Sequence, residues 1–507
     1  MDHLTWEELL ELARYVRTNP LFDREERERK SEIAAGLRRA IRGLAAGDGS
    51  LDRIDAVLRS GAHYSLPAQH QYEWFARWAS RDRASLVTAI AEFAAPETTA
   101  SERFSRFASF AERVDAAQPA QPGGILAFGS LFNFAFESRD LPCVNAFLFE
   151  RLEEMLGHDP PTGSAAEQYA GHLEFASAMQ RRLLEAKLPI RDMLDVQALI
   201  LICSRDLRVW ISAASDAELQ RRSKAAPPQA RDSAIPYLSV CACLGYDAPY
   251  LEEWLEFHRA VGVERFFLYN NGDRERQGEL LAPYVEDGIV ILHDWPVNPP
   301  QIAAFQNCLR EHAGDSRWIA FMDTDEFLFS PAGEPLPTVL RGYERWPGIG
   351  VCRAHYGPSG HETKPPGLVI ESYVERLAWG DTNVKSIVDP SRVTACVHPH
   401  FFVYAEGEAV DENEHPIKGW RTTFASFDRI RMNHYMTRSV EEFRVKSAYL
   451  RADTGGPRAS KWFENTLRGF EIFGRRDDVI LRLAPAVRER LAQLRPSPHA
   501  TNGVRGR

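Results

Sequence analysis

The stretch RWIAFMDTDEFLF, residues 317–329, places a cluster of acids directly after a run of apolar residues. The apolar run 318–322 predicts the end of a buried strand. Asp323, Asp325 and Glu326 follow it, and carboxylates this close together repel one another and lose hydration when they are buried. The sequence therefore predicts a charged site at the end of a strand, with a cation that compensates the carboxylates.

Length and composition favour a globular protein of more than one domain. A chain of 507 residues is too long for one ordinary core, which favours two or three domains. Hydrophobic residues make up 44% and charged residues 26%, as is typical of globular chains. The formal net charge of −10 argues against general binding to nucleic acids. No run of about 18 apolar residues occurs, so no membrane-spanning helix is expected.

The cysteines favour a reducing compartment. There are seven of them, an odd number without a paired framework, which indicates free thiols and a cytoplasmic protein. The N-terminus lacks a basic segment followed by an apolar one, so no signal peptide is expected. Cys241 and Cys243 lie two positions apart in a strand-like run, and we expect them to share one face as small core residues.

Residues 1–222 predict an all-helical domain whose role the sequence leaves open. Segments such as LTWEELLELARYV, residues 4–16, repeat apolar residues at helical spacing. This domain could bind the acceptor or a protein partner, associate with a second copy, or brace the rest of the chain. The polar, proline-containing residues 223–234 predict a linker, and residues 491–507 predict a flexible tail.

From residue 235 the pattern changes to alternating strands and helices, which predicts an α/β domain over residues 235–490. Steps of this length are typical of βαβ units, so we expect a mainly parallel sheet. The expected strands cover residues 235–244, 264–271, 289–295 and 317–327. The expected helices cover residues 249–263, 278–288 and 300–313.

The acidic strand end is in the position where α/β sheets bind ligands, beyond the carboxyl ends of their strands. Asp323 and Asp325 are two positions apart, so on extended backbone their carboxylates would face the same side. Hard oxygen ligands suit Mg²⁺ or Mn²⁺. A divalent cation is therefore the expected compensation, and a solvated acidic turn is the alternative.

Four stretches together resemble glycosyltransferase family 92. They are APYLEEWLEFHRAVGVERFFLYNN (248–271), RWIAFMDTDEFLF (317–329), KSIVDPSRV (385–393) and RMNHYMTRSVEEFRVKS (431–447). Their order and spacing also match, and the resemblance covers residues of about 235–450. It implies the GT-A fold, a Rossmann-type mixed sheet flanked by helices, preceded here by the all-α N-terminal domain.

The resemblance also implies a metal site and a phosphate site. Asp323 and Asp325 resemble the D-x-D pair that holds Mn²⁺, or Mg²⁺, against the diphosphate of a nucleotide-sugar. His434 resembles the late histidine that completes the metal site. Lys385 and Lys446 fall where such enzymes keep basic residues near the phosphates, and there they could offset the charge of a departing diphosphate.

The nucleotide would lie near the first two strands. Asn270 and Asn271 resemble residues at the edge of the nucleotide pocket. Asp273 could contact the ribose, although turn chemistry explains NGD equally well. Family members usually carry Asn-Glu before the first helix, whereas this chain has Tyr246 and Asp247. Asp247 could replace the acid, and the lost amide changes the expected contact with the nucleobase.

The implied reaction moves a sugar from a nucleotide-sugar to the hydroxyl of a glycan or another acceptor, with inversion at the anomeric centre. A UDP-sugar is expected, UDP-galactose being the family's best-known donor type, although the chain reads as bacterial and could use another donor. One general base must deprotonate the acceptor. The candidates are His361 and Glu371 on the acceptor side and Glu326 beside the metal pair.

Two other classes of function stay open at this point. A metal-dependent phosphoesterase or pyrophosphatase could use the same acidic strand end, although two-metal hydrolysis needs more ligands than this stretch and His434 offer. A non-catalytic protein that binds nucleotide-sugars or glycans is the other, favoured only by the departure at Tyr246 and Asp247.

Overall fold

The computed structural model describes residues 4–494, apart from 20, 48, 61–68, 96, 115–121, 205–234, 246–247 and 460. The chain divides into two compact units, Met1–Ile211 and Ser212–Arg507. The predicted linker at 223–234 and the candidate nucleotide ligand Asp247 lie outside the described residues. The predicted tail starts too early, because helix α18 continues to Leu494.

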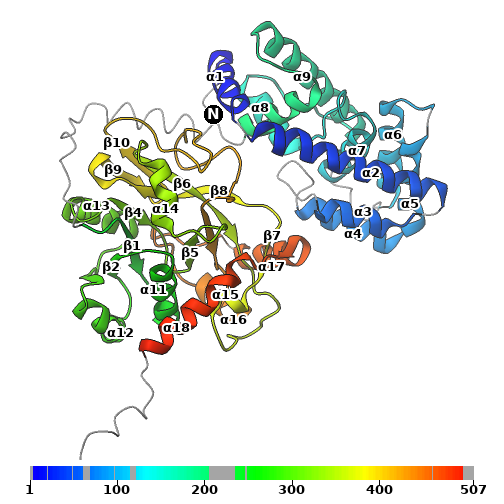
Figure 1. Ribbon diagram of the computed structural model, residues 1–507. Coiled ribbons are helices and arrows are strands. Elements are labelled where there is room, and N and C mark those ends of the chain that lie inside the picture. The colour runs from blue at the N-terminus through cyan, green and yellow to red at the C-terminus, as the bar shows by residue number, and fades with distance from the viewer. Residues whose placement is uncertain are drawn as a thin grey trace, which may run out of the picture. The chain divides into compact units, whose positions relative to one another are not determined.

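The described part of the first unit is helical, as predicted (Figure 1). Helix α1 begins where Thr5 and Glu8 form a capping box, and α9 begins at a second one formed by Ser164 and Glu167. Residues 193–204 are also helical. The other helices are α1 (Trp6–Arg17), α2 (Arg29–Ala46), α3 (Leu51–Ser60), α4 (Gln69–Arg81), α5 (Arg83–Ala91), α6 (Ala100–Val114), α7 (Pro122–Glu137), α8 (Ala146–Met155) and α9 (Ala165–Glu185).

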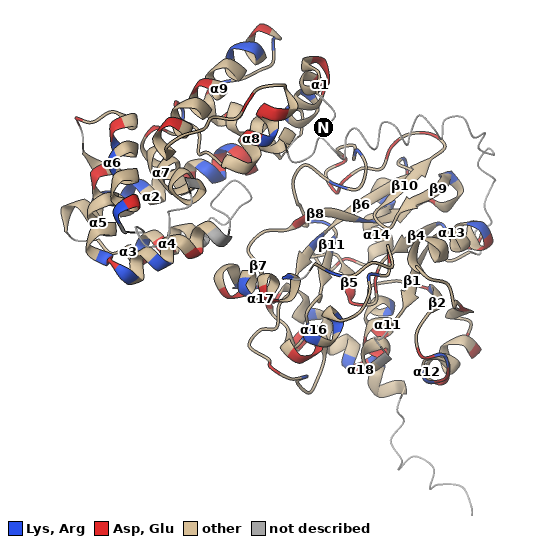
Figure 2. Ribbon diagram, turned by 180° about the vertical axis from the view of Figure 1, so that it is seen from behind, with Lys and Arg blue, Asp and Glu red and all other residues tan. Residues whose placement is uncertain are grey.

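Helix α7 forms the centre of this unit, because it is apolar on nearly every side and contacts α2, α4, α6 and α9. Phe128 and Phe132 on α7 are fully buried. Gly129 allows α6 to approach, since a Cβ there would lie 2.6 Å from the Phe104 ring. The charged residues lie on the surrounding helices, where Figure 2 shows both signs on α2, α6 and α9.

The second unit is built on an eight-stranded mixed sheet in the order β3-β2-β1-β4-β8-β6-β11-β5. The predicted α/β class with a mixed sheet flanked by helices is confirmed. Two-stranded sheets β9–β10 and β7–β12 lie outside it. The strands are β1 (Leu238–Leu244), β2 (Arg265–Asn270), β3 (Val290–Asp294), β4 (Trp318–Phe321), β5 (Glu326–Phe329), β6 (Gly348–His355), β7 (Glu375–Leu377), β8 (Asp381–Val388), β9 (Val393–His398), β10 (Phe401–Tyr404), β11 (Arg431–His434) and β12 (Gly474–Arg476).

The directions of the strands bring the carboxyl ends of some strands and the amino ends of others to the same edge of the sheet. Strands β3, β2, β1 and β4 are parallel, and β6 and β11 run the same way. Strands β8 and β5 run against them, so their amino ends lie at the edge where the others have their carboxyl ends. We call this the carboxyl edge of the sheet.

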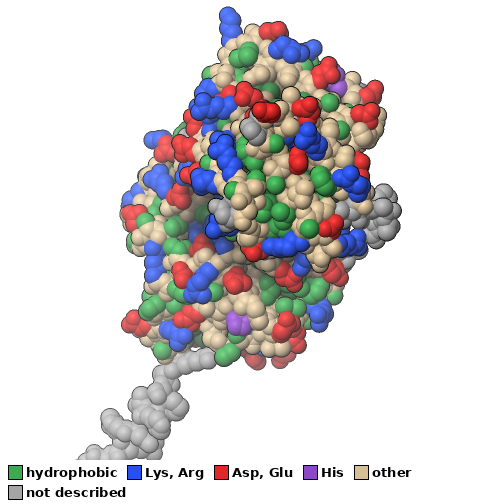
Figure 3. All heavy atoms as spheres, turned by 90° about the vertical axis from the view of Figure 1, so that its right-hand side faces the viewer, with side chains coloured by type: hydrophobic (Ala, Val, Ile, Leu, Met, Phe, Trp, Pro, Cys, Tyr) green, Lys and Arg blue, Asp and Glu red, His purple; other side chains and the backbone are tan. Residues whose placement is uncertain are grey.

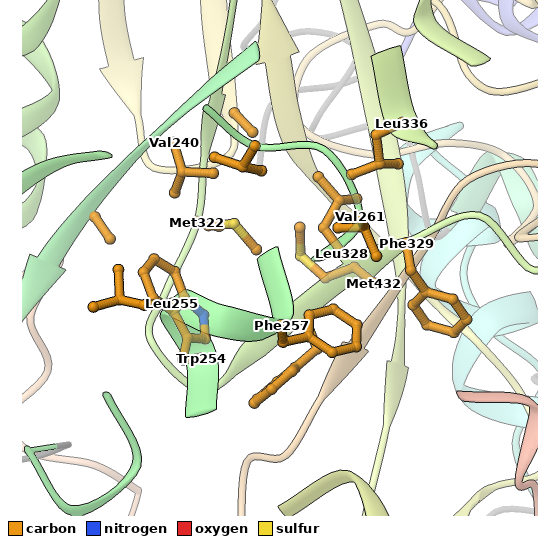
Figure 4. Packing of buried hydrophobic residues seen from close by; sticks show 14 of the residues in the cluster. Val240, Trp254, Leu255, Phe257, Val261, Met322, Leu328, Phe329, Leu336 and Met432 are labelled. Atoms are coloured by element: carbon orange, nitrogen blue, oxygen red, sulfur yellow. The ribbon is translucent and has the colours of Figure 1, made fainter. Parts of the chain in front are cut away.

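Helices cover both faces of the sheet. They are α11 (Leu251–Ala260), α12 (Arg274–Glu286), α13 (Gln301–His312), α14 (Leu336–Leu340), α15 (Val369–Ser372), α16 (Val440–Ser447), α17 (Trp462–Phe473) and α18 (Ala484–Leu494). On one face Val240, Trp254 and Phe257 pack in the larger core, which Figure 4 shows around α11. On the other face Phe305 of α13 packs with Cys241, and Cys243 lies against the same cluster. The prediction that these two cysteines share a face is confirmed.

Trp254 and His258 of α11 attach this helix to β5. The indole N–H of Trp254 donates to the carbonyl of Glu326 over 2.8 Å. The Nδ1–H of His258 donates to the carbonyl of Trp254 over 2.7 Å, and its Nε2 accepts the amide of Leu328 at 3.1 Å. His258 is fully buried, so burial lowers its pKa to about 3 and it remains neutral.

The surface is mixed in charge. Figure 3 shows Lys and Arg interspersed with Asp and Glu over the face that it displays, and neither sign dominates there. Among the described residues, no helix is both long enough and apolar enough to cross a bilayer.

The buried His258 predicts a pH-dependent stability. An unfolded histidine titrates near pH 6.5, whereas folded His258 titrates near 3, so the unfolded state binds the extra proton as pH falls between these values. The contribution of His258 to the free energy of unfolding is therefore complete above about pH 6.5 and is lost as pH falls towards 3. Between pH 7 and 5 the loss is about 2 kcal/mol. Urea unfolding at both pH values should show that loss in the wild type and a smaller one in His258→Gln. The exposed His158→Gln is the control, and an equal loss in all three proteins would contradict the assignment.

Candidate active site

A turn at the carboxyl edge carries the acidic cluster. Strand β4 ends at Phe321, and the amide of Glu326 donates to the carbonyl of Asp323 over 3.1 Å before β5 begins. The backbone is therefore not extended from Asp323 to Asp325, and the prediction of a single strand over 317–327 is wrong. The turn reverses the chain because β5 has to return as the antiparallel partner of β11.

Asp323 is held by side chains from two other elements. One carboxylate oxygen accepts a hydrogen bond from the side-chain amide of Gln301, the first residue of α13. The other lies 2.9 Å from the ammonium of Lys385 on β8. Lys385 is fully buried and makes this contact as an ion pair without hydrogen-bond geometry. The first compensating charge is thus a lysine of the chain itself.

Asp325 is held separately and more deeply. Its carboxylate accepts a hydrogen bond from Lys446 of α16, and its Oδ1 lies 3.5 Å from Nε2 of His434. Burial alone would raise the pKa of Asp325, but Lys446 and His434 outweigh it and hold the pKa well below its usual range. The Asp325 carboxylate is therefore ionised. It is paired with Lys446, whereas Asp323 is paired with Lys385.

Glu326 is the most enclosed acid of the cluster, with no exposed surface. Its carboxylate accepts the amide of Asp323 at 2.8 Å and lies 3.3 Å from Arg353 and 3.5 Å from Lys385. Burial raises the pKa of Glu326 to about 7, against the opposing effect of Lys385. These contacts give Glu326 a structural role at the start of β5.

Three residues that the sequence interpretation did not name complete the cluster. Arg353 and His355 lie at the end of β6, and both contact the carboxylate of Asp381 at the start of β8. Nδ1 of His355 in turn lies 3.1 Å from Nδ1 of His434. A chain of contacts therefore runs from Asp381 through two imidazoles to Asp325.

When both imidazoles are neutral, this chain of contacts is one hydrogen short. Asp381–His355, His355–His434 and His434–Asp325 each need one hydrogen, and the two rings then carry two. Burial lowers the pKa of His434 to about 4, so this ring is neutral near pH 7. If the first two contacts hold the two hydrogens, Nε2 of His434 turns a lone pair towards the Asp325 carboxylate. A neutral imidazole nitrogen facing a carboxylate across 3.5 Å is a donor set that suits a divalent cation.

The described residues contain no group of three or more His, Cys, Asp or Glu side chains arranged around one point for a metal. Asp325 and His434 are brought together, whereas the carboxylate of Asp323 is directed to Lys385 and Gln301. Two protein ligands are enough for Mg²⁺-like ions when substrate phosphates and water supply the rest. The residues present therefore fit a metal that binds together with a phosphorylated substrate.

The residues expected near the nucleotide have structural contacts in this chain. The side-chain oxygen of Asn270 accepts a hydrogen bond from the backbone N–H of Gly272. The side-chain NH₂ of Asn271 donates to the carbonyls of Trp295 and Val297 at 2.6 and 2.9 Å. Asp273 caps the N-terminus of α12, as the alternative of turn chemistry predicted. These side chains shape the loops after β2 and β3 at the carboxyl edge.

Of the candidate bases, Glu371 is engaged on the surface of the unit, where both its oxygens accept from Arg488 of α18. His361 lies beside α16, where its carbonyl accepts the amide of Val440. Nε2 of His361 lies 3.1 Å from the carbonyl oxygen of Ser372. That contact makes Nε2 the protonated nitrogen, which leaves Nδ1 as the basic atom of a neutral His361. Within the described residues, neither His361 nor Glu371 forms a hydrogen bond or ion pair with the acidic cluster.

Comparisons with known proteins find similarity to glycosyltransferases. Residues 237–451 match the family model described as glycosyltransferase family 92, which confirms the predicted resemblance over about 235–450. A glycosyltransferase family 92 protein of Arabidopsis thaliana is 34% identical over 184 residues, which are 34% of this chain and 32% of that protein. A galactan beta-1,4-galactosyltransferase of the same plant is 27% identical over 201 residues, or 36% of this chain and 38% of its own.

The chain spans less than half the length of these curated relatives, which are plant proteins. Among solved structures, a mannosyltransferase from Pyrobaculum calidifontis in complex with GDP-Man and Mn²⁺ is similar over 59% of this chain and 86% of its own. Its sequence identity of 12% and TM-score of 0.24 are too low to transfer any residue.

The pairing of Lys385 predicts a large loss of stability when its charge is removed. Lys385→Met leaves Glu326 fully buried beside one cation fewer, and breaking such a pair costs about 3 kcal/mol or more. Lys418→Met is the matched control, since Lys418 pairs with Glu408 at the surface and should lose under about 1 kcal/mol. Urea unfolding of both variants measures the difference. Similar small losses would show that the acids do not depend on Lys385.

Proposed function

Residues 237–451 form a glycosyltransferase family 92 domain, and we propose that this domain transfers a glycosyl group from a nucleotide-sugar to an acceptor hydroxyl. The observation that carries the proposal is the pairing of Asp325 with His434 at the carboxyl edge, where α/β sheets bind ligands. Two lysines reach the same acidic turn from β8 and α16. Carboxylate, imidazole and ammonium groups in this arrangement suit a diphosphate bound through a divalent cation.

The proposed donor is a UDP-sugar, with UDP-galactose first among the candidates. Its support is the similarity of residues in this domain to a galactan beta-1,4-galactosyltransferase. The loops that Asn270, Asn271 and Asp273 organise lie at the carboxyl edge of β2 and β3, the region where such sheets bind nucleotides.

The proposed metal is Mn²⁺ or Mg²⁺, held by Asp325 and His434 with Asp323 beside them. When bound, it would act as a Lewis acid on the leaving diphosphate. Asp381 and His355 keep the ring of His434 oriented, as partners of metal-binding histidines generally do. Lys446 is within reach of Asp325 and would offset negative charge that builds up on the departing phosphate.

The proposed displacement proceeds in one step with inversion. The acceptor oxygen forms a bond to the anomeric carbon as the bond from that carbon to the phosphate oxygen breaks, and the hydroxyl proton passes to a base. Of the three candidates, His361 is favoured, because the Ser372 carbonyl takes its Nε2–H and leaves Nδ1 as the ring nitrogen that can accept a proton. The charge of Glu371 is paired with that of Arg488, and Glu326 has no exposed surface that an acceptor could reach.

The direct test is release of UDP from a panel of UDP-sugars with Mn²⁺, with and without a chelator. Asp325→Asn removes the negative charge of a metal ligand and leaves its size unchanged, so turnover should fall about 100-fold or more. Asp287→Asn is the matched control, because Asp287 is exposed at the end of α12 and should keep full activity.

Equal UDP release from Asp325→Asn and the wild type, or release that a chelator leaves unchanged, would contradict the proposal. Hydrolysis of simple phosphodiesters without any transfer of sugar would instead favour the phosphoesterase alternative. Tight binding of a UDP-sugar without turnover over a broad acceptor panel would favour a binding protein.

A further inference from the structure

Arg458 lies outside the part of the chain that matches the family, which ends at residue 451, and Asp325 and Asp323 of the acidic turn are among the charges that act on it. It belongs to the segment 448–459 between α16 and α17. The carbonyl oxygen of Ala452 in this segment accepts a hydrogen bond from the backbone N–H of Gln301 at 3.4 Å. The side chain of Gln301 donates to Asp323. The segment is therefore fastened to the same residue of α13 that holds the acidic turn.

The guanidinium of Arg458 lies over an aromatic ring that packs against a second one. Its central carbon lies 4.4 Å from the centre of the Trp462 ring. Trp462 packs edge-on against Phe443, which is fully buried on α16. Because α16 also carries Lys446, which contacts Asp325, the same helix supports both the ring beneath Arg458 and a cation of the acidic turn.

The hydrogen-bond donors of Arg458 are not used up by the protein. Its Nε–H is buried and has no hydrogen-bond partner, and Arg458 makes no ion pair with any residue that the structure describes. Leaving a buried N–H without an acceptor is costly. Burial lowers the pKa of Arg458, and Asp325 and Asp323 are among the negative charges that oppose this. Lys385 and Lys446, by contrast, are each paired with an aspartate.

We propose that Arg458 binds the diphosphate of the nucleotide-sugar, because its guanidinium combines a buried donor that has no partner with the lack of an ion pair to any described residue. This inference rests on the proposed function. The planar fork of an arginine presents several N–H groups to two phosphate oxygens at once, which an ammonium cannot do. A diphosphate would supply acceptors for the buried Nε–H and a counter-charge for the guanidinium, which the contact with the Trp462 ring helps to hold in place.

Calorimetric titration of the full-length protein tests the proposal, with UDP, GDP and ADP as probes in the presence of Mn²⁺. The Kd of the tightest-binding diphosphate should rise at least 10-fold in Arg458→Gln. It should rise less in Arg458→Lys, which keeps the charge but loses the fork. The Tm without nucleotide should be unchanged, which a purely structural role for Arg458 would not predict. Arg468→Gln is the matched control, since Arg468 pairs with Glu471 on the exposed side of α17 and should bind like the wild type.

The outcomes separate this inference from the proposed function. If the wild type binds a nucleoside diphosphate and Arg458→Gln binds it equally well, the assignment of Arg458 is overturned and the proposed function stands. If the wild type binds none of the three probes, both fail together. If Arg458→Gln has a lower Tm, Arg458→Lys decides, and wild-type affinity in a stable Arg458→Lys would overturn the role of the fork.

Discussion

The structure of the second unit depends on pairing three carboxylates that one tight turn brings together. Asp323, Asp325 and Glu326 each find a cation from a different element, and Lys385 serves two of them. A buried carboxylate without a partner would cost several kcal/mol, so the elements that carry these cations have to meet at the turn. The requirement explains why a fully buried lysine is tolerated on the central strand β8.

The mixed direction of the sheet is what concentrates so much charge at one edge. Parallel strands β4, β6 and β11 deliver Asp323, His355 and His434 from their carboxyl ends. The antiparallel strand β8 delivers Asp381 from its amino end. A purely parallel sheet would place the amino end of every strand at the opposite edge, so Asp381 could not meet His355 there. The histidine pair and its two flanking carboxylates thus follow from the strand order.

Much of this could be predicted from the sequence. Alternating apolar runs located β1 to β4, and the rule that ligands bind at carboxyl ends singled out Asp323 and Asp325. The turn itself was missed, because periodicity does not show where a strand ends when the residues after it are still partly buried. Asp381 was missed because the carboxyl-end rule does not apply to an antiparallel strand. Arg458 was missed because a lone arginine in a loop gives no signal until Trp462 and Gln301 locate it.

The central claim is that Asp325 and His434 hold a divalent cation together with the donor's diphosphate. It is tested most directly by anomalous diffraction from crystals grown with Mn²⁺ and UDP. The account predicts an anomalous peak within bonding distance of a carboxylate oxygen of Asp325 and Nε2 of His434, in contact with phosphate oxygens. A nucleotide bound at the sheet edge with its manganese peak away from both side chains would contradict it.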